Sequence, residues 1–210
     1  MSFQVERSSV DADAWRRALE QAAQAGGRLG ALWGTDEGAR FAVHALLVVH
    51  ERLVCLKLEL EGTSYPDVSG AFPAAARMQR ALADLLGVRA GSDERGWLRH
   101  GAWSADSFPL RKEAPPGARL PAGDARYAFV QVEGDGVHEI PVGPVHAGII
   151  EPGHFRFSVV GERVLRLEQR LGYAHKGIEK RFESMSLDEG ARLAGRVSGD
   201  STVAFAWAYA

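Results

Sequence analysis

Apolar residues in the first sixty positions repeat first with the period of a helix and then with the period of strands. Within residues 11–25 they return every three or four positions, at Trp15, Ala18, Leu19 and Ala22. This spacing predicts an amphipathic helix, and Gly26-Gly27 predicts its end. Residues 29–33 and 41–49 are rich in apolar side chains and predict two strands.

Residues 53–60 alternate strictly, which predicts a strand with one buried face. The side chains expected on the buried face are Val54, Leu56, Leu58 and Leu60. Cys55 falls on the other face, where we expect a small packing residue rather than a redox group. Residues 50–52 predict the turn that precedes this strand.

A second helix is predicted over residues 74–86. Pro73 stands at the expected first helical position, where its fixed φ favours a helix start, and Gly87 follows the last turn. Residues 91–112 then show no regular period, although they contain the aromatic side chains Trp97, Trp103 and Phe108. We expect this segment to lie as a loop across a protein surface.

The composition changes at residues 113–125, where Pro, Gly and Ala dominate and apolar anchors are few. Such a composition is typical of a linker. The sequence therefore predicts a first domain over residues 1–112 and a second domain over residues 126–210.

The second domain is predicted to begin with short antiparallel strands and to continue into helices. Strand-like patterns occupy residues 127–133, 137–141, 154–159 and 165–171. The last two predict a hairpin with a polar face. Helices are predicted over residues 176–185 and from Leu187 to about Arg196, the second behind an S-x-x-E capping box that begins at Ser186.

Residues 202–210 are apolar nearly all round, so a helix there is expected to be buried. It stops at Ala210 without a polar cap, and we expect either a fragment or a shortened protein whose last helix needs partner helices. The whole pattern predicts an α+β fold. It comprises an N-terminal antiparallel sheet with helices, the linker, a small antiparallel β region and the start of a helical bundle.

Composition excludes several functional classes. The 25 basic and 27 acidic residues give a net charge of -2, which argues against the concentrated positive field of a nucleic-acid-binding surface. Cys55 is the only cysteine in the sequence, which excludes an intrachain disulfide and a thiolate cluster. No apolar run reaches the roughly 18 residues needed to span a bilayer, so a partner would have to hold this protein at a membrane.

Loop glycines, histidines and carboxylates are concentrated between residues 143 and 202. Three motifs follow one another there: Glu151-Pro152-Gly153-His154, His175-Lys176-Gly177-Ile178-Glu179 and Arg196-Val197-Ser198-Gly199-Asp200-Ser201. They resemble the E-G-H, R-G-F/I/L-E and R-I/V-C-G-x-C motifs of the large subunit of nickel–iron (NiFe) hydrogenases. The same order resembles the complex I subunit beside the quinone, and most of all the large subunit of formate-hydrogenlyase-type complexes.

The first domain resembles a different protein of complex I, its small hydrophilic subunit. Three segments carry this resemblance: residues 73–80, Asp84-Leu85-Leu86-Gly87 and Pro109-Leu110-Arg111-Lys112. Where that family usually has the Trp and the two Glu of W-x-E-R-E, this chain has Arg77, Gln79 and Ala81. The two subunit types are fused in one chain in the formate-hydrogenlyase branch, which favours that branch over complex I itself.

The donor atoms of the third motif do not suit a nickel–iron centre. In a hydrogenase its two cysteines bind the metals through soft thiolates, whereas Ser198 and Ser201 offer hydroxyls and Asp200 offers one hard carboxylate. We therefore expect no nickel–iron centre in this chain. The histidines also lack the short ligand spacing of a zinc site, so no bound metal is expected.

The resemblance implies that the loop of the first motif shapes a pocket for protons or a quinone. His146 matches the histidine of the complex I quinone loop, where an imidazole is suited to donate a proton. The alternative is that His146 caps a turn. Two positions depart from the complex I pattern, because Ile150 replaces its second histidine and Leu187 falls near its quinone-contacting tyrosine.

Glu151 matches the hydrogenase glutamate that passes protons beside the metal, and we expect a buried proton-relay carboxylate near residues 198–201. The alternative is a solvated loop acid. The resemblance places Arg196 and Asp200 near an iron–sulphur cluster of a partner, although an exposed arginine at a helix C-terminus is equally consistent for Arg196. His175 and Glu179 are expected to fix a helix start.

These features predict a subunit of a membrane-associated electron-transfer complex of the NADH:quinone oxidoreductase or formate-hydrogenlyase kind, inactive alone. Iron–sulphur and membrane subunits would hold it on the cytoplasmic face of the cell membrane. No cofactor is expected in the chain itself; electrons would come from an iron–sulphur cluster in a partner, and quinone is the candidate ligand. The alternatives are a non-catalytic scaffold module of such a complex and a fragment of a genuine nickel–iron hydrogenase large subunit.

Overall fold

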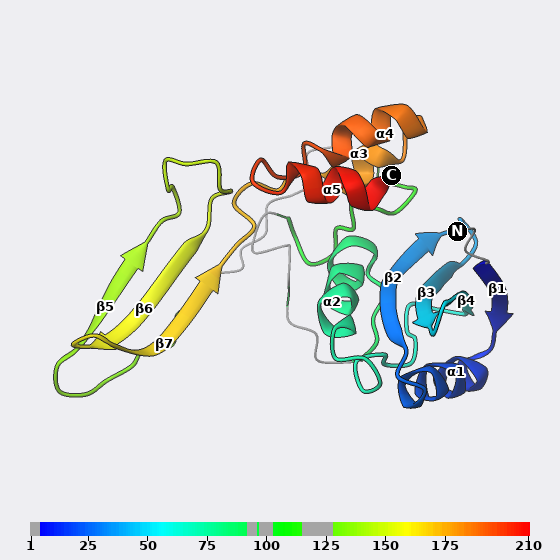
Figure 1. Cartoon of the computed structure of the whole chain (residues 1–210), viewed down its shortest axis with the longest axis horizontal. Coiled ribbons are helices and arrows are strands. Elements are labelled where there is room, and N and C mark those ends of the chain that lie inside the picture. Colours follow the sequence, from blue (N-terminus) through cyan, green and yellow to red (C-terminus); the bar gives the residue numbers. More distant parts are fainter. Residues whose placement is uncertain (1–4, 92–95, 97–102, 115–127) are drawn as a thin grey trace. The chain divides into compact units, whose positions relative to one another are not determined.

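The computed structural model describes residues 5–91, 96, 103–114 and 128–210 (Figure 1). The chain divides into two compact units, one formed by residues 1–99 and 103–122 and the other by residues 100–102 and 123–210. Most of the predicted linker lies outside the described residues, as does Trp97. The conformation expected for the linker therefore stays a prediction.

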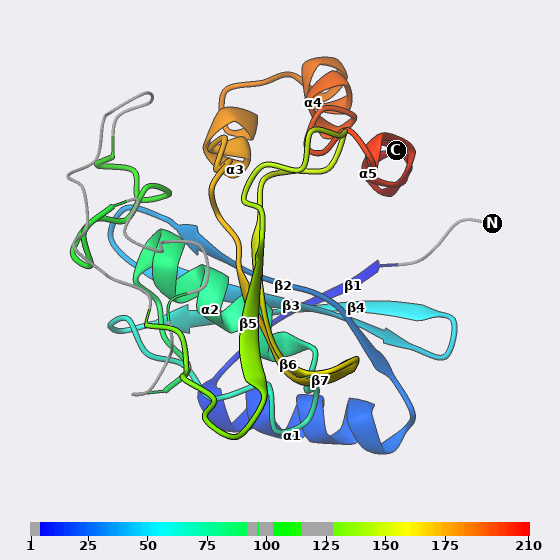
Figure 2. The ribbon, with the colours of Figure 1, turned by 90° about the vertical axis from the view of Figure 1, so that its left-hand side faces the viewer.

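The first unit is a four-stranded sheet with two helices on one of its faces (Figure 2). Its elements are β1 (Val5–Val10), α1 (Ala12–Gln24), β2 (Arg28–Asp36), β3 (Phe41–Val49), β4 (Arg52–Leu60) and α2 (Ala75–Leu86). The strand order is β1-β4-β3-β2, in which β1 runs parallel to β4 and the other pairs are antiparallel. The two helices and strands β2 to β4 confirm the elements that the hydrophobic pattern predicts. The pattern does not predict β1, because that strand is mostly polar.

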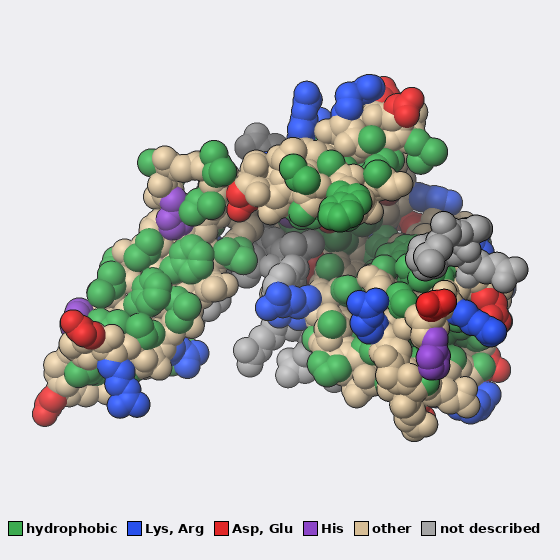
Figure 3. Space-filling view, in the orientation of Figure 1, with side chains coloured by type: hydrophobic (Ala, Val, Ile, Leu, Met, Phe, Trp, Pro, Cys, Tyr) green, Lys and Arg blue, Asp and Glu red, His purple; other side chains and the backbone are tan. Residues whose placement is uncertain are grey.

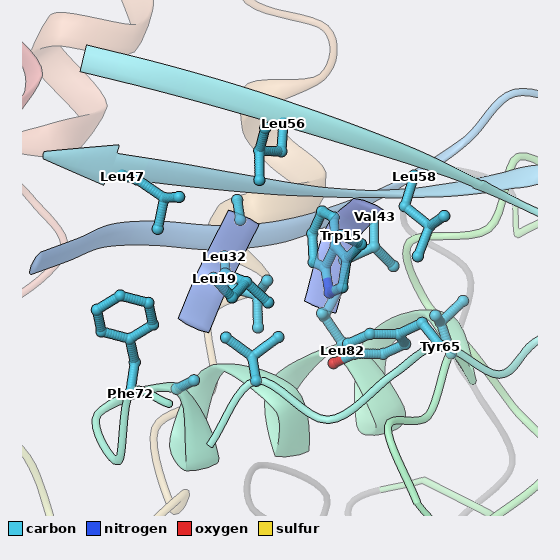
Figure 4. Packing of buried hydrophobic residues seen from close by; sticks show 14 of the residues in the cluster. Trp15, Leu19, Leu32, Val43, Leu47, Leu56, Leu58, Tyr65, Phe72 and Leu82 are labelled. Carbon is cyan, nitrogen blue, oxygen red and sulfur yellow. The ribbon is translucent and has the colours of Figure 1, made fainter. Parts of the chain in front are cut away.

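Large apolar side chains from the sheet and from both helices meet between the two layers (Figure 4). Trp15 is fully buried and Leu19 is 1% exposed, on the face of α1 that the helical period predicts. Strand β4 buries Leu56, Leu58 and Leu60, as its alternation predicts. Because burying such a side chain contributes about 1.5–3 kcal/mol, the first unit has a substantial core of its own.

The ends of the helices follow from particular residues. Asp11 caps α1 by accepting a hydrogen bond of 2.7 Å from the N–H of Ala14. Helix α2 begins at Ala75, so the expectation that Pro73 occupies its first position is wrong. A tight turn precedes the helix, since the N–H of Ala75 donates to the carbonyl of Phe72.

Residues 103–114 return across the first unit, as the irregular aromatic segment predicts. Arg111 Nε donates to the carbonyl of Leu86 at 2.9 Å, which satisfies an acceptor at the end of α2. The N–H of Lys112 donates to the Asp36 carboxylate, also at 2.9 Å. This return segment therefore joins the end of α2 to the end of β2.

The second unit contains a three-stranded antiparallel sheet and three short helices. Its elements are β5 (Val137–Val142), β6 (His154–Val160), β7 (Arg163–Arg170), α3 (Ile178–Phe182), α4 (Leu187–Ala194) and α5 (Thr202–Tyr209), with strand order β5-β6-β7. The predicted hairpin is confirmed. The capping box is confirmed as well, because Ser186 and Glu189 exchange side-chain-to-backbone hydrogen bonds. The α+β class of the chain is therefore confirmed.

Residues 128–133 do not form the strand that was expected at 127–133, and Tyr127 lies outside the described residues. The N–H of Val130 donates to the Glu168 carboxylate at 3.1 Å instead of to a strand carbonyl. The ring of Phe129 lies 4.1 Å from the guanidinium carbon of Arg156. Side-chain contacts thus hold the segment over the polar face of the hairpin, and alternation along the chain does not encode such contacts.

Helix α5 is not buried within the described chain, contrary to expectation. Val203 is 77% exposed and Trp207 is 81% exposed. Tyr209 links α5 to the other two helices, because its ring stacks on Phe182 at 5.7 Å and its hydroxyl donates to the Leu187 carbonyl at 3.0 Å. Figure 3 shows hydrophobic side chains on the surface of this helix and of the second sheet.

Among the described residues, no helix is long and apolar enough to cross a bilayer.

Candidate functional site

The loop between β5 and β6 is closed at its base by two histidines. His146 Nε2 lies 2.8 Å from the carbonyl oxygen of Gly153, and His154 Nδ1 lies 3.3 Å from the carbonyl oxygen of Gly143. The N–H of Gly153 also donates to the carbonyl of Pro144 at 3.0 Å. A carbonyl oxygen only accepts, so each of these ring nitrogens carries a proton.

Gly143 permits this closure. Its φ of +81° lies in the left-handed region, which residues with a Cβ rarely adopt. A Cβ at this position would collide with the carbonyl oxygen of Gly153 and would lie 2.7 Å from His146 Nε2. The sequence therefore needs a glycine where the two ends of the loop approach each other.

His146 adopts the turn-capping arrangement that the sequence left open. Its ring is half-buried and packs edge-on against Phe155, with 5.8 Å between ring centroids. Because Nε2–H is engaged by Gly153, a neutral ring presents an acceptor at Nδ1. Donation of a proton to a ligand from Nδ1 would require the imidazolium form, and that role stays a prediction.

The three sequence motifs meet at Lys176. Its ammonium lies 2.5 Å from Glu151 Oε1 and donates to the carbonyl of Val197 at 3.0 Å. Gly199 also approaches the loop that leads into the first motif, since a Cβ there would lie 3.5 Å from the carbonyl oxygen of Ile149. We call Glu151, Lys176 and residues 196–202 the three-loop junction.

Glu151 is not buried, which corrects the expectation of a buried relay carboxylate. Its side chain is 38% exposed and that of Lys176 is 37% exposed. Removing two charges from water is costly, and a pair at the surface keeps much of its hydration. The relay role stays a prediction, now for a carboxylate that is open to water and bound by an ammonium group.

Asp200 is surrounded by hydroxyl groups. The Ser198 hydroxyl donates a short hydrogen bond to Asp200 Oδ1, and Ser201 Oγ lies 3.5 Å from the same oxygen. The hydrogen bond from Ser198 is the main reason that the pKa of Asp200 lies below its ordinary value. This carboxylate is therefore ionised at neutral pH.

These donors do not fit a nickel–iron centre. Two serine hydroxyls stand where the motif of a hydrogenase supplies soft thiolates, with one carboxylate between them, and serine does not ionise near neutral pH. Across residues 5–91, 96, 103–114 and 128–210, no group of three or more His, Cys, Asp or Glu side chains is placed to hold a metal ion.

The remaining predicted residues lie at helix ends. Arg196 is exposed and follows α4, where its N–H donates to the carbonyl of Leu193 at 2.8 Å. This position suits a cation, because the C-terminal end of a helix carries partial negative charge. His175 Nδ1 accepts from the N–H of Gly177 at 3.1 Å, just before α3. That contact is consistent with the helix-start role expected for His175.

Sequence reasoning missed Lys176. It lies between His175 and Glu179, the two residues of its motif that we singled out, at the position where the hydrogenase motif has arginine. A retained positive charge at that position was the available signal. The structure brings Lys176 together with Glu151 and with the loop that contains Asp200.

Residues 8–119 match the family described as respiratory-chain NADH dehydrogenase, 30 kDa subunit. The chain belongs to this family. The matched range includes the second half of β1, all of β2 to β4, both helices of the first unit and the return segment.

Longer relatives match across both units. Formate hydrogenlyase subunit 5 of Escherichia coli (strain K12) is 34% identical over 199 residues, which cover 88% of this chain and 35% of the relative. Hydrogenase-4 component G of the same organism is 33% identical over 198 residues, with coverages of 87% and 36%. The C/D subunit of NADH-quinone oxidoreductase of Phocaeicola vulgatus is 28% identical over 157 residues, with coverages of 65% and 30%.

This chain therefore spans about a third of the length of these relatives. The resemblance to a fused subunit of the complex I and hydrogenase type is confirmed, because the matches extend from the 30 kDa-type region into the second unit.

Proposed function

We propose that this chain is part of a subunit of a membrane-associated electron-transfer complex of the NADH:quinone oxidoreductase or formate-hydrogenlyase kind. The relatives are named as subunits or components of such enzymes. Partner subunits hold the chain on the cytoplasmic face of the membrane, and one of them carries the iron–sulphur cluster that delivers electrons. The single observation that carries the proposal is the convergence of the three motifs on Lys176.

Within this complex, the three-loop junction exchanges protons beside the electron-transfer partner. Glu151 carries the proton, because its carboxylate is open to water and is fixed by an ammonium group. His146 lies in the same loop between β5 and β6 as Glu151 and assists as an imidazolium. A quinone-type carrier is the candidate ligand. This chain contributes no nickel–iron centre, because its third motif offers hydroxyls in place of thiolates.

Affinity purification from mildly solubilised membranes tests the assembly. A tagged full-length subunit is expected to bring down an iron–sulphur subunit and membrane subunits in stoichiometric amounts. Recovery of the tagged subunit without either class of partner would contradict the proposal. Stoichiometric nickel in the purified subunit would instead favour a genuine hydrogenase large subunit.

Replacement of Glu151 tests the chemistry. Glu151→Gln removes the charge and keeps the shape, and it should lower the turnover of the complex by about 10²-fold or more, the range typical of a lost acid–base group. Glu139→Gln is the matched control, because the Glu139 side chain is also 38% exposed and pairs with a cation, Arg156. Equal activity of the two variants would contradict the proton role.

One observation favours a second candidate function, a scaffold module without chemistry. His146 uses its Nε2–H to close its own loop, so its arrangement already has a structural purpose. If neither Glu151→Gln nor His146→Gln lowers turnover while the complex still assembles, the scaffold function is the correct one.

A further inference from the structure

We propose that Lys176 is a positioning residue that holds the Glu151 carboxylate against the loop of residues 196–202. Its ammonium has three N–H donors, and two of them go to Glu151 Oε1 and to the carbonyl oxygen of Val197. Both acceptors carry negative charge or partial charge, so they repel each other without a cation between them. Lys176 therefore supplies the attraction that keeps the two loops together.

The range of this interaction distinguishes it from the other ion pairs described in the second unit. Lys180 pairs with Glu183 within one helical turn at 2.8 Å, and Arg156 pairs with Glu139 across neighbouring strands at 3.4 Å. Arg166 pairs with Glu168, two positions away on the same strand, at 3.5 Å. Lys176 instead joins residues 25 and 21 positions away in sequence. Neither acceptor lies in a helix or strand, so no regular backbone pattern fixes its position.

The positive charge matters more than the exact side chain. Arginine has a planar group with five N–H donors and a longer reach, and it can serve a carboxylate and a carbonyl at the same time. Methionine has a similar length and no charge. Lys176→Arg is therefore expected to keep the junction, and Lys176→Met is expected to open it.

Hydrogen exchange of the full chain tests the contact directly. In Lys176→Met, amides of residues 196–202 should exchange about fivefold faster, the factor for an ion pair at the upper end of the range for exposed pairs. Lys176→Arg should stay within about twofold of the unmodified chain. Arg181→Met is the control on the same segment, because it also removes an exposed cation and the ion pairs among the described residues do not include Arg181. It should leave the exchange of residues 196–202 unchanged.

Two results would overturn the positioning role. One is unchanged exchange of residues 196–202 in Lys176→Met. The other is an equal increase in Arg181→Met, which would indicate a general loosening of the helices. Circular dichroism of each variant checks that the fold is retained, and Lys176→Arg still tests the role of charge if the methionine variant folds poorly.

The role in turnover rests on the proposed function, since Glu151 is the proton carrier there. In the assembled complex, Lys176→Met should lower kcat about fivefold with KM unchanged, and Lys176→Arg should restore kcat. Faster exchange with unchanged kcat would support the loop-holding role and contradict the proton role of Glu151. Lower kcat with unchanged exchange would overturn the positioning role and leave the proton role standing.

Discussion

The two units of this chain differ in how far they bury a helical tryptophan. Trp15 on α1 is fully buried against the sheet of the first unit, whereas Trp207 on α5 is 81% exposed. The second sheet shows the same contrast, because Leu165 and Leu167 are 44% and 46% exposed. The first unit encloses its own core, while the second leaves apolar surface open and concentrates its polar contacts in loops.

We expect this difference to give the two units different roles. The sheet and the two helices of the first unit enclose Trp15 in a packed core. The second unit carries the loops that converge on Lys176, and its exposed apolar side chains are the kind of surface that marks contact with other proteins. We expect substitutions in the first unit to change stability and those in the second to change loop order or activity.

The largest expected effect separates the two tryptophans. Trp15→Ala should lower the free energy of unfolding by about 3–5 kcal/mol, because it leaves a large cavity in a packed core. Trp207→Ala should change it by less than about 0.5 kcal/mol, as for most surface positions. Chemical denaturation of both variants measures the difference. Similar losses would show that α5 is packed in solution and would remove the contrast.

The next effect concerns the base of the loop between β5 and β6. Gly143→Ala forces a Cβ into a left-handed backbone and into the carbonyl of Gly153, which should cost about 1–3 kcal/mol of local stability. Hydrogen exchange of residues 143–153 should rise accordingly. Gly148→Ala is the control, because its nearest neighbour would lie 4.0 Å away. Unchanged exchange in the first variant would mean that the histidine closure is not formed.

A smaller effect is expected where α5 rests on α4. A Cβ at Gly190 would lie 2.9 Å from Tyr209 Cζ, so Gly190→Ala should displace that ring at a cost of about 1–2 kcal/mol. The near-ultraviolet circular dichroism of Tyr209 and faster exchange of residues 202–209 report the displacement. Gly195→Ala should have little effect, since its closest contact would be an ordinary 3.6 Å. Identical spectra for the two variants would show that Tyr209 does not pack there.

The smallest effect lies in the first unit and depends on pH. Partial burial opposes the charge of Asp36, but the N–H groups of Lys112 and Gly38 and the nearby cations outweigh it, so the pKa of Asp36 is lowered. Its contribution is complete above the ordinary aspartate value of about 3.9 and is lost as pH falls below that value.

Asp36→Asn should therefore cost about 1 kcal/mol or less at pH 7 and nothing near pH 2, because the charge is absent there in both chains. Denaturant midpoints measured from pH 7 downward give the comparison. Asp13→Asn is the control, because the ion pair of Asp13 joins it to Arg16 on its own helix at an exposed position. A pH-independent loss in the Asp36 variant would place its role in packing rather than in charge.

Much of the first unit could be predicted from the sequence, because helices and strands repeat apolar residues at fixed intervals. Trp15 and Leu19 follow the helical period, and Leu56 and Leu58 follow the strand period. The polar strand β1 has no such signal. It pairs with β4, which is distant in sequence, and only the fold brings the two together.

The candidate site was predicted less completely. The resemblance identified Glu151 and the third motif. It wrongly predicted that the Glu151 carboxylate is buried, and it did not identify Lys176 as its partner. Burial and partners depend on which loops meet, and hydrophobic periodicity says nothing about loops. The strand expected at residues 127–133 was wrong for the same reason, since Val130 pairs with the side chain of Glu168.

The sequence by itself determined the chemistry available to this protein: two hydroxyls and a carboxylate in place of thiolates, one cysteine, and three motifs in a fixed order. It also determined the local elements, because their periods depend only on neighbouring residues. The tertiary structure alone decided that the ammonium of Lys176 joins Glu151 to the carbonyl of Val197. Contacts between loops more than twenty residues apart in sequence depend on the path of the whole chain. No local pattern encodes that path.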